Sequence, residues 1–149
     1  MGADHAGFEL KEAVRLRLEA DGHEVTDVGT HDSESTDYPP YAAEAAGLVS
    51  SGQAERGVIV CGSGNGVAIV ANKVPGIRAV NAHDVAEAEM ARRHNNINVV
   101  TLSGARLDPD EAGLIVDRFL TEDFEGGRHE RRVGEIATVE RTVAEGTAS

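Results

Sequence analysis

The chain has 149 residues, 40% of them hydrophobic and only 3% aromatic, and its formal net charge is −12. This length suits one domain with a core of Val, Ile, Leu and Ala, and the negative charge argues against binding to nucleic acid. No apolar run approaches the roughly 20 residues of a membrane span, and no signal peptide is recognisable. The single cysteine cannot form an internal disulfide, which fits the reducing cytoplasm. We therefore expect a cytoplasmic protein, and without a membrane span we expect no membrane contact.

The first half of the chain predicts an alternation of strands and helices. Asp4-His5 has the character of a strand end, yet only three residues precede it, fewer than the usual length of about 5–6. We therefore expect either a start upstream of Met1 or a sheet that lacks most of one strand. The next elements are a helix at Phe8–Ala20 ended by Gly22, a strand at His23–Gly29, a polar loop at Thr30–Tyr38, a helix from Pro39-Pro40 to Ser51, a strand at Val58–Cys61 and a helix at Gly66–Lys73.

The second half continues the alternation and predicts the fold class. Its elements are a strand at Ile77–Val80, a helix at Asp84–His94 capped by Asp84, a strand at Asn98–Leu102, a helix at Leu107–Leu120 that begins through Asp108-Pro109, and a terminal helix at about 128–145, most regular over Val133–Ala144. This pattern favours one α/β domain over residues 1–149. We expect a three-layer αβα sandwich with a parallel sheet of the Rossmann or flavodoxin-like kind.

A glycine-rich loop, Gly62-Ser63-Gly64-Asn65-Gly66, directly follows the buried strand that ends at Cys61. In open α/β sheets, ligands bind beyond the carboxyl ends of the strands, where backbone N–H groups can face an anion. The even glycine spacing matches neither a Walker loop nor the G-x-G-x-x-G dinucleotide pattern. The loop therefore indicates close approach of a ligand, with a tight strand-to-helix turn as the alternative.

Cys61 and His94 are the candidates for proton transfer. Cys61 lies beside a predicted helix N-terminus, which stabilises a thiolate, although a free cysteine is also often a small buried hydrophobe. His94 closes its helix, and histidine is the side chain suited to proton transfer near neutral pH. The alternative for His94-Asn95-Asn96 is a plain helix end, with Asn95 or Asn96 as a left-handed cap.

Arg128-His129-Glu130-Arg131-Arg132 is the one basic cluster of an acidic chain. Arg128 and Arg132 are four residues apart on one helix face, and two guanidinium groups there suit a phosphate monoester. A solvated helix start is the alternative. Asp4 and His5 are either loop residues or an acid and a base. The remaining histidines have no metal-ligand spacing, and without HExxH or CxxC we expect no metal.

Together these segments resemble the type B ribose-5-phosphate isomerases of the ribose/galactose isomerase family. The resemblance runs in consistent order from Gly2 to about Ala137. The segments that carry it are Gly2-Ala3-Asp4-His5-Ala6-Gly7-Phe8-Glu9-Leu10-Lys11, Asp37-Tyr38-Pro39, Cys61-Gly62-Ser63-Gly64-Asn65-Gly66, Ala71-Asn72-Lys73-Val74-Pro75-Gly76-Ile77-Arg78, Arg93-His94-Asn95-Asn96, Gly104-Ala105-Arg106 and Gly127-Arg128-His129.

The resemblance implies an aldose–ketose isomerase without a cofactor, which interconverts ribose 5-phosphate and ribulose 5-phosphate through an enediolate. It makes Cys61 the base between C1 and C2 and His94 the acid that assists ring opening. Some family members instead use a glutamate just after the glycine loop, where this chain has Val67. The remaining implied contacts are N–H groups of Gly62, Ser63, Gly64, Asn65 and Gly66 to the enediolate, Asp4 and His5 near the sugar ring, and Asn95, Arg106, Arg128 and Arg132 on the sugar and phosphate.

The resemblance also implies a homodimer, or a dimer of dimers, whose active sites combine parts of two chains, with the C-terminal helix packed on the partner subunit. Two other functions stay open. One is isomerisation of a six-carbon sugar phosphate, such as allose or galactose 6-phosphate. The other is a sugar-phosphate-binding module without turnover, which explains the glycine loop but not Cys61, His94 and the arginine pair together.

Overall fold

The computed structural model describes residues 1–147, which form a four-stranded parallel sheet and six helices. Neighbouring strands follow the order β1-β2-β4-β3. The elements are β1 (Gly2–Ala3), α1 (Phe8–Ala20), α2 (Tyr38–Ser50), β2 (Gly57–Cys61), α3 (Asn65–Ala71), β3 (Ala79–Asn81), α4 (Val85–Asn95), β4 (Val99–Ser103), α5 (Pro109–Thr121) and α6 (Arg128–Thr147).

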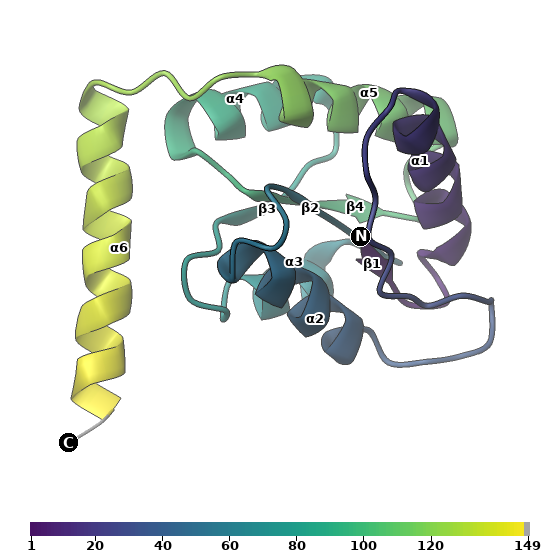
Figure 1. Ribbon diagram of the computed structural model, residues 1–149, viewed down its shortest axis with the longest axis horizontal. Coiled ribbons are helices and arrows are strands. Elements are labelled where there is room, and N and C mark those ends of the chain that lie inside the picture. Colours follow the sequence, from purple (N-terminus) through teal and green to yellow (C-terminus); the bar gives the residue numbers. More distant parts are fainter. Residues whose placement is uncertain (148–149) are drawn as a thin grey trace.

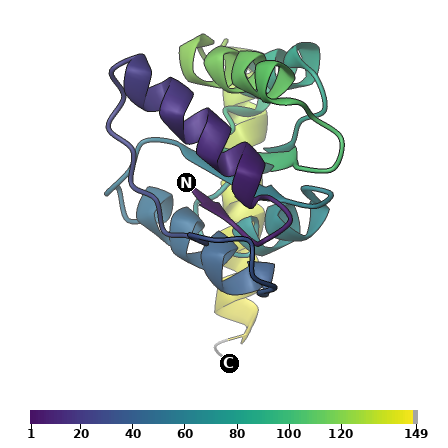
Figure 2. The same cartoon turned by 90° about the vertical axis from the view of Figure 1, so that its right-hand side faces the viewer.

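Two layers of helices enclose the sheet, as the sequence predicts. Helices α1, α4 and α5 cover one face, and α2 and α3 cover the other (Figures 1 and 2). Every residue of β2 and β4 is buried, because both strands lie in the middle of the sheet and contribute apolar side chains to the two faces. The αβα sandwich is thereby confirmed.

The local signals at the helix ends are confirmed. The Asp84 carboxylate accepts a hydrogen bond from the N–H of Glu87 over 2.8 Å, and Asp108 forms a full capping box with Glu111. Helix α4 ends at Asn96, whose φ of 48° and ψ of 47° are left-handed, and Gly22 follows α1 with a φ of 89°.

The predicted strand at His23–Gly29 is wrong. The segment runs beside β1 and hydrogen-bonds to it: Val28 N–H donates to the Met1 carbonyl over 3.0 Å, and Ala3 N–H donates to the Gly29 carbonyl. In a regular parallel ladder, Ala3 N–H would donate to the Val28 carbonyl, so the register between the two segments shifts by one residue here. The shift occurs at Gly29, whose φ of 105° is far from that of an extended strand. A regular ladder therefore does not form, although the segment extends the sheet edge. Strand β1 has only two residues, in line with the short first strand expected.

Helix α6 stands apart from the two layers (Figure 1). It touches the body near its start, where His129 stacks on His94, and further along, where the Glu140 carboxylate accepts from Gly76 N–H over 3.0 Å. Between α6 and the β3 edge lies a largely apolar groove of about 480 Å³, lined by Ile77, Ala79, Val80, Ile97, Ile136 and Val139 among others. Among the described residues, no helix is both long enough and apolar enough to cross a membrane.

Candidate active site

Cys61 lies at the carboxyl end of β2, buried, with its sulfur facing the glycine loop. Gly64 N–H donates to its Sγ over 3.2 Å. An N–H directed at sulfur stabilises negative charge on it, as a proton-accepting thiolate needs. The predicted position of Cys61 at a strand end beside a helix start is thereby confirmed, and its role in a reaction stays a prediction.

Hydrogen bonds from side chains of β3 and β4 hold the glycine loop in shape. Thr101 Oγ1 donates to the Gly64 carbonyl over 2.8 Å, and Ser103 Oγ donates to the Gly62 carbonyl over 2.7 Å. Asn81 Nδ2 donates to the Ser63 carbonyl over 3.0 Å and to Asn65 Oδ1 over 2.8 Å. The loop is therefore a rigid platform at the carboxyl edge of the sheet.

The N–H groups of the glycine loop differ in whether a protein atom accepts a hydrogen bond from them. Gly64 N–H is used by Cys61, and Asn65 N–H donates to Ser63 Oγ over 3.1 Å. Within residues 1–147, the N–H groups of Gly62, Ser63 and Gly66 have no protein acceptor. The expectation that the loop presents N–H groups to an anion therefore narrows to these three donors.

Asp4, His5 and Arg106 lie at the same edge as Cys61. Asp4 follows Ala3, which pairs with Val60, and its buried carboxylate accepts from Gly7 N–H over 3.0 Å. His5 is exposed, and its Nδ1 contacts the backbone of Thr36 at 3.1 Å. Arg106 is exposed in the turn after β4, next to Ala105, whose N–H donates to the Gly62 carbonyl. The structure thus brings these three predicted residues together with the glycine loop.

His94 and Asn95 lie at the opposite edge. They end α4, which leads into the start of β4, and the Asn95 carbonyl accepts from Arg78 Nε over 3.2 Å just before β3 begins. Strand β2 separates the two edges by ~13 Å, at about 3.3 Å per residue. Within one chain, the structure therefore does not bring Cys61 and His94 together.

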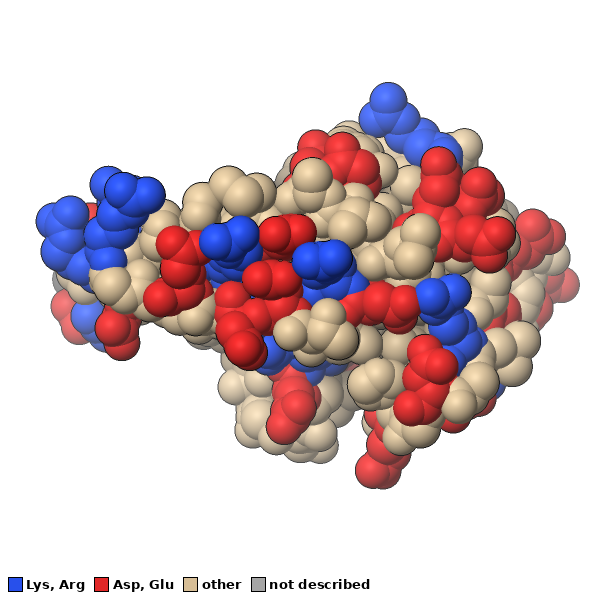
Figure 3. All heavy atoms as spheres, turned by 90° about the horizontal axis from the view of Figure 1, so that it is seen from above, with Lys and Arg blue, Asp and Glu red and all other residues tan. Residues whose placement is uncertain are grey.

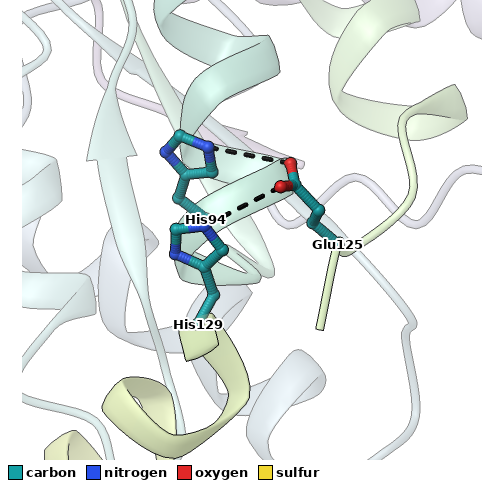
Figure 4. A group of neighbouring side chains, drawn as sticks. All are labelled: His94, Glu125 and His129. Atoms are coloured by element: carbon teal, nitrogen blue, oxygen red, sulfur yellow. Dashed lines mark ion pairs between the residues drawn. The ribbon is translucent and has the colours of Figure 1, made fainter. Parts of the chain in front are cut away.

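His94 belongs to a compact group with Glu125 and His129 (Figure 4). The two imidazole rings stack with centroids 4.2 Å apart and planes 9° from parallel. Glu125 Oε2 lies 3.7 Å from His94 Nε2, and its Oε1 lies 3.9 Å from His129 Nε2. The three ligand atoms lie within 4.8 Å of one another, a gathering of metal-binding residue types that the sequence did not reveal. A metal ion needs ligand lone pairs that point toward one centre. The lone pairs of two stacked, parallel rings lie in parallel planes instead, which suits contact with a substrate better.

Positively charged side chains also lie close to this histidine pair. Arg128 and Arg132 lie in the first turns of α6, both exposed, and Arg128 Nε is 3.4 Å from His129 Nε2. Figure 3 shows basic side chains gathered where α6 begins, apart from the mixed charges over the neighbouring helices. Burial lowers the pKa of His129, and the charges of His94 and Arg128 lower it further. This end of the molecule is therefore suited to an anion such as a phosphate group.

Sequence reasoning missed two contributors to these sites, Asn81 and Glu125. Asn81 ends β3, so its place at the carboxyl edge was a readable signal. Glu125 lies in an irregular connection, where no periodicity or motif indicates its neighbours. His129 appeared only as part of the basic cluster, and its stacking on His94 needs the tertiary fold.

Comparison with known proteins places the chain in one family. The family model described as Ribose/Galactose Isomerase matches residues 1–136. The ribose-5-phosphate isomerase B of Escherichia coli K12 is 42% identical over 94% of this chain and 94% of its own length. That of Mycobacterium tuberculosis H37Rv is 41% identical over 95% of this chain and 89% of its own length.

Solved structures agree. The ribose-5-phosphate isomerase B of Clostridium thermocellum superposes with a TM-score of 0.94 at 44% identity, covering 95% of this chain and 96% of that one. The enzyme of Mycoplasma genitalium with bound ribulose-5-phosphate has a TM-score of 0.90 at 37% identity, covering 94% and 93%. By sequence and by fold, the chain belongs to the ribose/galactose isomerase family.

Proposed function

We propose that this protein is an isomerase that interconverts ribose 5-phosphate and ribulose 5-phosphate without a cofactor. The observation that carries the proposal is Cys61, whose buried sulfur accepts from Gly64 N–H beside three further loop N–H groups without a protein acceptor. The family membership supports it, as does the related Mycoplasma genitalium structure with bound ribulose-5-phosphate. The single cysteine and the charge of −12 support a cytoplasmic enzyme that does not bind nucleic acid.

The reaction needs a base that works on both carbons of an enediolate. The Cys61 thiolate removes the proton from C2 of the open-chain aldose, and the negative charge moves onto O1. The hydroxyl proton then passes from O2 to O1, and the Cys61 thiol returns its proton to C1 as the carbonyl forms at C2. The N–H groups of Gly62, Ser63 and Gly66 stabilise the negative charge, in the manner of an oxyanion hole. Val67 has no proton-accepting group, so Cys61 is the base in this loop.

The cyclic sugar must open before this step. His94 donates a proton to the ring oxygen as the bond from C1 to that oxygen breaks, and the C1 hydroxyl loses its proton to solvent. Arg128 and Arg132 hold the phosphate, with Asn95 and Arg106 on the sugar and Asp4 and His5 near the ring.

We propose that a complete site forms between two copies of the chain, in a homodimer or a dimer of dimers. One copy supplies the carboxyl-edge group (Asp4, His5, the loop from Cys61 to Gly66, and Arg106), and the other supplies the amino-edge group (His94, Asn95, Arg128 and Arg132). The distance between these groups within one chain supports this arrangement, and a twofold dimer would contain two such sites.

The exposed face of α6 supports packing on a second copy. Ile136, Val139 and Val143 follow helical spacing and expose 48%, 63% and 62% of their surface. They lie beside the apolar groove along β3, so a partner that covers both would bury this surface.

The test is turnover together with solvent-deuterium exchange. Ribulose 5-phosphate is open-chain, so deuterium uptake at its C1 requires the base but no ring opening. Cys61→Ala should lower both exchange and kcat by about 10²–10⁴-fold with little change in KM, and Cys61→Ser should be nearly as poor. His94→Ala should keep the exchange and lose kcat from ribose 5-phosphate.

Two outcomes would overturn the assignment. If Cys61→Ala keeps more than about half of the activity, the base lies elsewhere. If kcat/KM is higher for allose or galactose 6-phosphate than for ribose 5-phosphate, the six-carbon alternative replaces the present one. Binding of ribose 5-phosphate without any turnover would favour the binding module.

A further inference from the structure

Glu125 is fixed over the last turn of α4, although it belongs to the irregular connection between α5 and α6. Its N–H donates to the Arg93 carbonyl over 3.0 Å, and Arg93 Nε donates back to its Oε2 over 3.1 Å. Backbone and side chain are thus both anchored to one residue of α4. A carboxylate whose side chain is 43% exposed would otherwise sample many positions.

This anchored carboxylate faces both imidazoles of the histidine pair. Each carboxylate oxygen lies near a different ring: Oε2 is 3.7 Å from His94 Nε2, and Oε1 is 3.9 Å from His129 Nε2 (Figure 4). These distances exceed those of hydrogen bonds, so the carboxylate acts on the rings through its charge. A negative charge next to both Nε2 atoms favours the forms in which these atoms carry hydrogen.

Apart from Glu125, the charges that most affect the pKa of His129 are positive. Burial is the largest influence that lowers the pKa of His129, followed by the charges of His94 and Arg128, and Arg132 adds to them. The Glu125 carboxylate is the influence that raises this pKa. Arg93 of α4 also faces Glu125. Two other carboxylates lie near Arg93: Glu122 is 3.9 Å from its Nε, and Glu89 is 3.2 Å from its Nη1. Glu125 is therefore the carboxylate that reaches the histidines.

We propose that Glu125 is a positioning residue of the isomerase, which orients the stacked His94–His129 pair and keeps a proton on it for ring opening. The Glu125 carboxylate opposes the positive charge of the arginines beside the pair, and so it favours a proton on the imidazoles. The inference rests on the proposed function, in which His94 donates the proton to the ring oxygen. Glu125 itself does not touch the reacting atoms.

Glu125→Gln tests this, because it removes the charge and keeps the shape. Glu89→Gln is the matched control, since Glu89 pairs with the same Arg93 and has no contact with either histidine. Three quantities are measured on the full chain: the NMR titration midpoint of His129, assigned by loss of its signal in His129→Asn, kcat from ribose 5-phosphate, and deuterium exchange into ribulose 5-phosphate.

In Glu125→Gln, we expect the His129 midpoint to move to lower pH, because the opposing negative charge is gone. We expect kcat from ribose 5-phosphate to fall by about tenfold, a part of the 10²–10⁴-fold that a positioned acid contributes. Exchange into ribulose 5-phosphate should stay within about twofold of wild type, because it bypasses ring opening. Glu89→Gln should leave all three near wild type, and Glu125→Asp, which keeps the charge, should recover most of kcat.

An unchanged His129 titration midpoint in Glu125→Gln would overturn the inference. Equal losses of kcat from ribose 5-phosphate in Glu125→Gln and Glu89→Gln would overturn it as well. A wild-type protein without isomerase activity would instead overturn the proposed function. In that case the His129 titration still shows whether the carboxylate acts on the pair.

Discussion

At the scale of single residues, the two proposed proton-transfer groups differ in how much of their surroundings the sequence reveals. Cys61 could be placed at a ligand-binding edge because it ends a β-branched run and precedes glycines. The partners of His94 could not be foreseen, because Glu125 and His129 meet it only through the path of the chain after α5. Contacts of this kind depend on tertiary structure and leave no periodicity in the sequence.

The phosphate-binding role of the basic cluster is tested by Arg132→Ala. KM for ribose 5-phosphate should rise by about tenfold or more with little change in kcat, because a hydrogen bond to a charged group contributes about 1.5–3 kcal/mol. Arg131→Ala is the control, since the exposed Arg131 is 3.6 Å from Glu135. An unchanged KM in Arg132→Ala would remove this residue from the site.

At the scale of elements, the sequence predicted each helix and three strands, because caps, prolines and apolar runs mark them directly. The segment at 23–29 was misjudged because its pattern resembles a strand, whereas its pairing with β1 shifts by one residue at Gly29. The precise shape of the glycine loop was also beyond the sequence. It depends on Asn81, Thr101 and Ser103, which come from other strands.

Gly64→Ala tests whether the loop must keep this shape. Gly64 has a φ of 78°, and an added Cβ would lie 2.3 Å from Asn81 Oδ1. Gly76→Ala is a matched control, because Gly76 has a φ of 81° with open space around it. Both substitutions place a residue with a Cβ at a left-handed backbone position, which costs about 1–2 kcal/mol of stability. Only Gly64→Ala should also displace the loop. We expect a larger fall in Tm and a loss of kcat in Gly64→Ala, and equal effects of the two variants would contradict this.

At the scale of the whole molecule, one chain carries its two groups of candidate site residues at opposite edges of its sheet. The sequence contained part of this result, because the helix at Asp84–His94 precedes a strand and must end at the amino edge. Cys61 ends a strand and lies at the carboxyl edge. The groove along α6 was not predictable, since it depends on how far α6 stands from β3.

Val139→Asp tests the interface proposed for α6. A charge in an apolar contact should shift the protein toward monomers and lower the activity with it, because each proposed site needs two chains. Leu114→Asp is the control, since Leu114 is 53% exposed on α5, away from that groove. Light scattering with size-exclusion chromatography measures the mass. A Val139→Asp protein that keeps both its oligomeric mass and its activity would exclude this face.

Mixing Cys61→Ala with His94→Ala tests whether the active site is shared between two chains. Each variant alone should convert ribose 5-phosphate poorly. After unfolding and joint refolding in equal amounts, half of the dimers pair one variant with the other. In these, one site of two has an intact Cys61 from one chain and an intact His94 from its partner. Activity should therefore return to about a quarter of wild type. A mixture no more active than its two components would show that Cys61 and His94 do not meet across chains, and would contradict the account.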